Sequence, residues 1–141
     1  MRRVIDPGTV LLAVLAAIGW GCGSQGTTTP PTQPTPTVTD TFNGTIAVNG
    51  AQSFSFNVQG AGTVTATLTT VAPDSQLTIG FSLGNWIATA NTCQIVLAND
   101  GAIQGAILTG SVSAAGSLCV RVYDVGKVVD PATFTVQVVH P

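Results

Sequence analysis

The chain carries one histidine, His140, next to the final residue of the sequence. Nucleophilic catalysis needs a base within hydrogen-bond reach of a serine or cysteine, and a terminal base lacks the supporting contacts that hold such a site in place. We therefore expect His140 to be an ordinary residue at the end of a strand. The sequence predicts no catalytic residues and a protein that is not an enzyme.

The acidic residues also give little indication of catalysis. All six are Asp and none is Glu. Five of them follow residue 39 and fall at turns or strand ends, where Asp is favoured for backbone reasons, so paired carboxylates that hydrolyse glycosides are not expected. Asp124 and Asp130 bracket one loop. A Ca²⁺ ion held there is a hypothesis, because this ion takes loop carboxylates and carbonyls. The alternative is two turn-forming aspartates, and no other cofactor is expected.

Two aromatic residues are candidates for ligand binding, as a platform for a sugar ring. Tyr123 has the opposite parity to Val120 and Val122 on a predicted strand and should face solvent, where an exposed aromatic ring suggests a binding surface. Trp86 is the other candidate. The alternative is that Trp86 packs in the core or at its rim, because a small domain needs its aromatic area inside.

Charged residues make up 7% of the 141 residues, against about a quarter in a typical soluble domain. Four of them are basic, so the chain lacks the basic stripe that neutralises phosphates. We expect no binding to nucleic acid.

The N-terminal part of the chain resembles an export signal. Arg2 and Arg3 precede a wholly apolar run, 10–18, which is typical of a secretory signal peptide and is too short to span a bilayer. The sequence Gly19-Trp20-Gly21-Cys22 then resembles a bacterial lipobox. This resemblance implies that residues 1–21 are a lipoprotein signal peptide and that Cys22 is lipidated and anchors the chain to a membrane.

A tether is predicted over residues 22–39. The 17 residues after Cys22 include seven Thr and four Pro and carry no charge. Such a composition cannot bury a core, so we expect an extended spacer that reaches on the order of 50 Å from the membrane.

Residues 40–141 form the predicted domain, and their apolar residues recur with a period of two. This pattern indicates strands with one buried and one wet face, separated by turn signals, and it favours an all-β, antiparallel, jelly-roll-like β-sandwich of about eight strands. Asn49-Gly50 between the first two strands predicts a tight hairpin. The predicted strands are 42–48, 53–58, 63–68, 77–83, 93–98, 105–113, 118–122 and 134–138.

Three cysteines in an exported chain leave one unpaired, and lipidation of Cys22 leaves Cys93 and Cys119 to form a disulfide. By parity Cys119 faces outward, whereas Cys93 shares the inward parity that we expect for Ile95 and Leu97. The two sulfurs meet only if the strand at 93–98 faces the other way, contains a bulge, or starts after Cys93. We favour the last alternative, with Cys93 in a loop end.

Several segments together resemble the bacterial pre-peptidase C-terminal domain. The segments are Phe42-Asn43-Gly44-Thr45-Ile46, Ser53 to Val58, Gly62 to Leu68 and Gly116 to Asp124. The resemblance covers nearly all of 40–141 and implies a jelly-roll-like sandwich without catalytic activity. Domains of this family usually follow a secreted peptidase and have proposed roles in secretion, substrate engagement or surface binding; ahead of this one we expect a signal peptide and a tether instead of a catalytic domain.

We therefore expect an exported, non-catalytic module, lipid-anchored in the bacterial cell envelope at the outer membrane or cell surface, that binds polysaccharide or protein. The alternative is a structural or accessory lipoprotein that supports an envelope assembly or a secreted hydrolase.

Overall fold

The computed structural model describes residues 36–141, so the expected signal peptide, Cys22 and the tether up to residue 35 lie outside the described residues. Val38 and Thr39, expected at the end of the tether, already belong to the first strand. Among residues 36–141 no helix is long and apolar enough to cross a membrane. The strands are β1 (Val38–Ile46), β2 (Ala51–Val58), β3 (Gly62–Ala72), β4 (Ile79–Ile87), β5 (Thr92–Ala102), β6 (Ile107–Val112), β7 (Gly116–Tyr123) and β8 (Ala132–His140).

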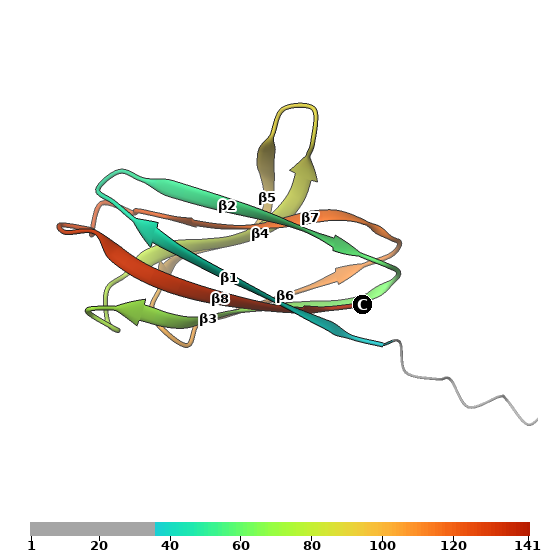
Figure 1. The fold of residues 1–141 in the computed structure, drawn as a ribbon, viewed down its shortest axis with the longest axis horizontal. Helices are drawn as coiled ribbons and strands as arrows, with labels where there is room; N and C mark the ends of the chain where they lie inside the picture. The colour runs from blue at the N-terminus through green and yellow to red at the C-terminus, as the bar shows by residue number, and fades with distance from the viewer. Residues whose placement is uncertain (1–35) are drawn as a thin grey trace, which may run out of the picture. The chain divides into compact units, whose positions relative to one another are not determined.

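The eight strands form two antiparallel sheets of four, in the orders β1-β8-β3-β6 and β2-β7-β4-β5, which lie as two layers (Figure 1). The prediction of an all-β sandwich is confirmed. Only β4 and β5 are neighbours both along the chain and within a sheet, since the other connections carry the chain from one sheet to the other. The edge strands β1 and β2 face each other on one side of the sandwich, and β5 and β6 on the other.

The turn at Asn49-Gly50 forms, but the predicted hairpin is wrong. Gly50 donates its N–H to the carbonyl of Ala47 at 2.9 Å, and Asn49 takes a left-handed φ of 56°, which Asn tolerates better than most residues. However, β1 pairs with β8 and β2 with β7. The turn therefore reverses the chain while moving it from one sheet to the other, because local turn chemistry does not choose a strand's partner.

The core lies between the sheets and is made by alternate residues of the strands, as predicted for β2, β3, β7 and β8. Burying such side chains is the main favourable term in folding, at about 25 cal/mol per Å² of apolar surface. The buried core members from these four strands are Phe56, Val58, Val64, Ala66, Leu68, Val71, Leu118, Val120, Val122, Ala132, Phe134, Val136 and Val138.

Strand β4 has both faces covered, which corrects the expectation of one wet face. Its outward residues Gly80, Ser82 and Gly84 are small, and Ser82 is 0% exposed. They lie opposite outward residues of β7, with Gly80 facing Tyr123 and Gly84 facing Cys119. Side chains of β7 can therefore cross β4 and reach β5 beyond it.

One of these crossings is the disulfide. Cys119 of β7 is bonded to Cys93 of β5, with Cα atoms 5.8 Å apart. In the chain-entropy model a bridge with a sequence separation of 26 contributes roughly 3–4 kcal/mol to the free energy of unfolding.

The placement of Cys93 in a loop end is wrong, since it is the second residue of β5. The inward facing expected for Ile95 is also wrong, because it pairs with Gly84 on the outer face of β4, whereas Leu97 pairs with the core residue Leu83 and faces inward as expected. The pairing register with β4 shifts between Leu83 and Gly84. This irregularity changes the facing of β5 and brings Cys93 to the outer side, where Cys119 lies.

The missing Cβ of Gly84 makes this approach possible. A Cβ at Gly84 would collide with main-chain atoms of Gln94 and Ile95 on β5. We expect Gly84→Ala to lower the free energy of unfolding by about 1–3 kcal/mol, because backbone must move to accept the methyl group. Urea unfolding of the oxidised protein measures the change.

Gly116→Ala is the matched control, since a Cβ on this β7 glycine meets nothing within 4 Å. Its free energy of unfolding should stay unchanged or rise by up to about 1 kcal/mol. Equal losses in the two variants would contradict the close approach of β5 to Gly84.

Candidate functional site

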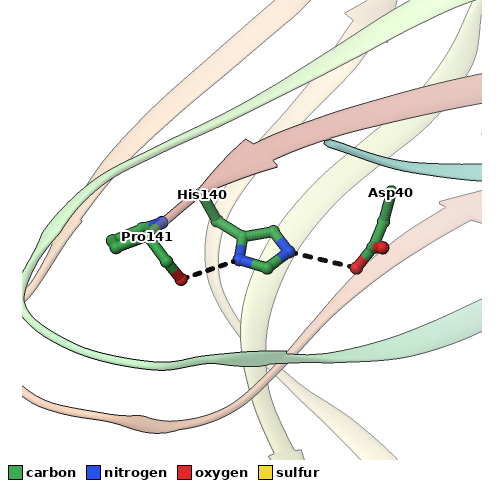
Figure 2. A network of polar contacts seen from close by, with 3 residues as sticks. All are labelled: Asp40, His140 and Pro141. Atoms are coloured by element: carbon green, nitrogen blue, oxygen red, sulfur yellow. Dashed lines mark hydrogen bonds and ion pairs between the residues drawn. The ribbon is translucent and has the colours of Figure 1, made fainter. Parts of the chain in front are cut away.

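His140 is more than the ordinary strand end expected from the sequence. The side chain is 3% exposed, and its ring centroid lies 5.1 Å from that of Phe56. Nε2 lies 3.0 Å from Oδ2 of Asp40, and Nδ1 lies 3.1 Å from the carbonyl oxygen of Pro141 (Figure 2). Both ring nitrogens thus face oxygen acceptors within the domain. This arrangement joins the start of β1 to the end of β8 and gives His140 a structural role.

Asp124 also has a structural role. Its Oδ2 accepts the N–H of Asn49 at 2.8 Å, and its Oδ1 accepts the N–H groups of Gly126, Lys127 and Val128 at 2.7 to 3.0 Å. These hydrogen bonds lower the pKa of Asp124 to about 2, with the bond from Asn49 the largest cause. The carboxylate therefore organises its own loop and ties it to the turn between β1 and β2.

Asp130 lies exposed in the same loop. Within residues 36–141, no three His, Cys, Asp or Glu side chains gather as a group that could hold a metal ion. The calcium hypothesis for Asp124 and Asp130 stays untested, while the turn-forming alternative accounts for the hydrogen bonds of Asp124.

Tyr123 faces outward as predicted, but its ring and hydroxyl already have partners. The hydroxyl donates a hydrogen bond to Asp100 of β5, and the guanidinium carbon of Arg121 lies 5.4 Å from the ring centroid. Burial, followed by this hydrogen bond and the nearby negative charge of Asp100, raises the pKa of Tyr123 to about 12, while Arg121 opposes the rise. After the disulfide, the hydrogen bond of Tyr123 is thus a second side-chain link from β7 across β4 to β5.

Trp86 is half-buried near the C-terminal end of β4, where it pairs with Cys93 of β5. Tyr123 lies opposite Gly80 at the other end of the same strand. The structure therefore does not bring Trp86 and Tyr123 together as one aromatic platform.

A cleft of about 450 Å³ opens on the side of the sandwich where β5 faces β6. This volume is within the usual range of ligand sites. Its base is formed by core residues of three strands, Val64, Leu83 and Leu118, and its walls by residues of β4, β5 and β6. The wall residues are Gly84, Asn85, Val96, Leu97, Thr109, Gly110, Ser111 and Val112.

The two open sides of the sandwich are filled very differently. On the β1 and β2 side, the rings of Phe42 and Phe54 stack at 5.2 Å across the sheets, and Phe54 meets Phe134 at 6.1 Å. On the β5 and β6 side the inward position opposite Val64 is a glycine, Gly110. A Cβ at Gly110 would lie 3.4 Å from Leu97 and 3.5 Å from Leu83. Small residues therefore leave open the space that large ones close on the opposite side.

The cleft is uncharged. Residues 36–141 contain seven charged side chains, and none of them lines the cleft, whose polar side chains are Asn85, Thr109 and Ser111. A second cavity of about 320 Å³ shares Asn85, Ser111, Val112 and Leu118 with the first and runs on to the turn between β6 and β7. Together they form one groove, apolar at its base and hydroxyl-bearing at its rim.

Sequence reasoning missed this groove, because no motif marks it. The available signal was the run Ile95-Val96-Leu97, which breaks the alternation of apolar and polar residues and leaves all three side chains at least 36% exposed. Such a run on an edge strand indicates either an irregular strand or an exposed apolar surface.

We expect the contribution of Asp124 to stability to depend on pH. Its pKa falls from 3.8 to about 2 on folding, so its contribution is complete above pH 4 to 5 and is lost as the pH falls toward 2. Asp124→Asn should therefore lower the midpoint of urea unfolding at pH 7, and the gap to the original protein should narrow on acidification.

Asp130→Asn controls for the loss of one charge in the same loop. A gap between the Asp124→Asn variant and the original protein that stays constant between pH 6 and pH 2 would refute this role for the Asp124 carboxylate.

Comparison of the chain with models of known protein families and with curated proteins finds no match.

Proposed function

We propose that this chain is a non-catalytic module of a bacterial cell envelope that is exported, anchored by lipid at Cys22, and binds a polysaccharide or protein through the groove between β5 and β6. The observation that carries the binding role is the groove itself, in which the core residues Leu83 and Leu118 form part of the lining beside uncharged polar groups. Ligand sites combine apolar walls with a few polar groups in this way.

The N-terminal sequence supports the location outside the cytoplasm. A basic start, an apolar run and Gly19-Trp20-Gly21-Cys22 together suit export followed by lipid attachment. The tether then gives the binding domain reach from the membrane.

We also propose a relation to the pre-peptidase C-terminal domain, which is itself a non-catalytic sandwich. The segments that carry the resemblance include β2, most of β3 and β7. In this proposal the domain engages its ligand directly instead of serving a peptidase on the same chain.

We expect Cys22→Ala to release the protein from the membrane fraction, because buried lipid contributes about 0.8 kcal/mol per methylene and several chains anchor stably. Fractionation and blotting of cells that express each variant measure this. Ser24→Ala, two residues further on, should stay with the membranes. A Cys22→Ala protein that folds and still sediments with membranes would overturn the lipid anchor.

Ligand binding is tested on the whole chain carrying Cys22→Ala, by glycan array and by pull-down from envelope extracts. Gly110→Val places methyl groups between Leu97 and Leu83 and should weaken capture at least tenfold. Gly60→Val is the matched control, because a Cβ at Gly60 meets nothing within 4 Å and this glycine lies outside the groove.

Unchanged capture by a folded Gly110→Val protein would exclude the groove as the binding site. Trp86→Ala addresses the sugar platform separately, and sugar binding that survives this change would argue against it.

A further inference from the structure

Both strands that border the groove are edge strands. Within the described residues, β6 pairs only with β3, and β5 pairs only with β4. Each therefore carries one row of main-chain N–H and C=O groups that no other strand binds, and such rows are ready to accept a further strand.

The lining of the groove shows that the edge of β6 borders it. Four consecutive residues of this strand, 109–112, line the cleft. Successive side chains of a strand point to opposite faces, so a site on one face of β6 would be lined by alternate residues only. Consecutive residues line a site that meets the strand at its edge, where the unpaired main chain is.

The chemistry of the lining restricts what can enter. None of the charged side chains of residues 36–141 faces the groove, so a charged group would lose water there without gaining an opposite charge. The base is apolar, whereas Thr109 and Ser111 on β6 and Asn85 on β4 offer hydrogen bonds. A chain that alternates apolar and hydroxyl side chains matches both surfaces.

Strand β3 already shows this match on the other edge of β6. Its residues Val64, Ala66 and Leu68 point into the core and alternate with Thr63, Thr65 and Thr67. It pairs antiparallel to β6 over 62–67.

We propose that the ligand of the groove is an extended, uncharged peptide segment of a partner protein, which pairs with the free edge of β6 as an added strand and places apolar side chains against Leu83 and Leu118. This inference rests on the proposed function and names the ligand class of the same site. Strand addition of this kind draws affinity from main-chain hydrogen bonds and specificity from alternate side-chain pockets.

The test uses a blocked synthetic peptide with the sequence of residues 62–70, GTVTATLTT, and the whole chain carrying Cys22→Ala. Amide hydrogen exchange is followed by NMR with and without millimolar peptide. We expect the amides of β6 that β3 leaves free to exchange at least tenfold more slowly when the peptide is present.

Two altered peptides keep the test independent of whether a protein variant folds. Proline in place of the central alanine removes an N–H and blocks strand pairing, and lysine in place of the leucine brings a charge to the apolar base. Both should abolish the protection, and equal protection by the proline peptide would overturn the inference.

The outcomes also separate this inference from the proposed function. Glycan binding that Gly110→Val weakens, with no protection of β6 by the peptide, overturns strand addition and leaves the groove as a sugar site. Peptide protection that Gly110→Val abolishes and Gly60→Val preserves supports strand addition. If Gly110→Val alters neither kind of binding, the groove is not the site and both proposals fail.

Discussion

The space between two stacked sheets must be filled by side chains from both inner faces. The largest apolar side chains that this domain has for the purpose are those of its five phenylalanines. Phe42, Phe54, Phe56 and Phe134 form contacts with one another on one side of the sandwich. The fifth, Phe81, is buried on β4 outside the cleft, and the apolar side chains that line the cleft on the opposite side are all valine or leucine. Protein interiors tolerate few voids, so an unevenly filled core is closed at one side and accessible at the other. The groove follows from where the large side chains lie.

On the open side of the sandwich, β5 has few side chains of the facing sheet to pack against. Contacts with β7 compensate for this. It lies between β2 and β4 in its sheet, yet two of its outward side chains reach β5 across β4. Cys119 crosses at Gly84 and Tyr123 at Gly80, so the small outward residues of β4 serve as a passage for longer side chains. The edge strand that forms one wall of the groove is therefore fixed at two places to a strand that is not its hydrogen-bonded neighbour.

Alternation of apolar residues predicted the sandwich and the facing of β2, β3, β7 and β8, because these strands have one side on the core and are regular over the predicted residues; the register shift in β3 comes after Leu68. The same reasoning failed for β5, where a register shift changes the facing within the strand and the Cys93 to Cys119 crossing selects the outer side. It failed again at Asn49-Gly50, since a turn signal is local and pairing is decided by the whole sheet.

The candidate site was harder to predict than the fold. The role of Asp124 followed the turn-forming alternative, because Asp readily accepts hydrogen bonds from nearby main chain. The burial of His140 depends on Asp40, which lies 100 residues away, and no local pattern reports such a contact. The groove depends on small residues from strands that are distant in sequence, and it has no motif at all.

The position of the contact between His140 and Asp40 has a consequence for how the domain would respond to a pull on the start of β1. Val38, the first residue of β1, lies opposite His140, the last residue of β8. A pull on the chain ahead of Val38 would act first on this end of the β1–β8 ladder, where the imidazole of His140 contacts Asp40, two residues further along β1 than Val38. Resistance to force depends on the rate of unfolding and not on the equilibrium stability. Because the contact between His140 and Asp40 lies at the loaded end of the ladder, it would have to break early in such a detachment, whatever its share of the total stability.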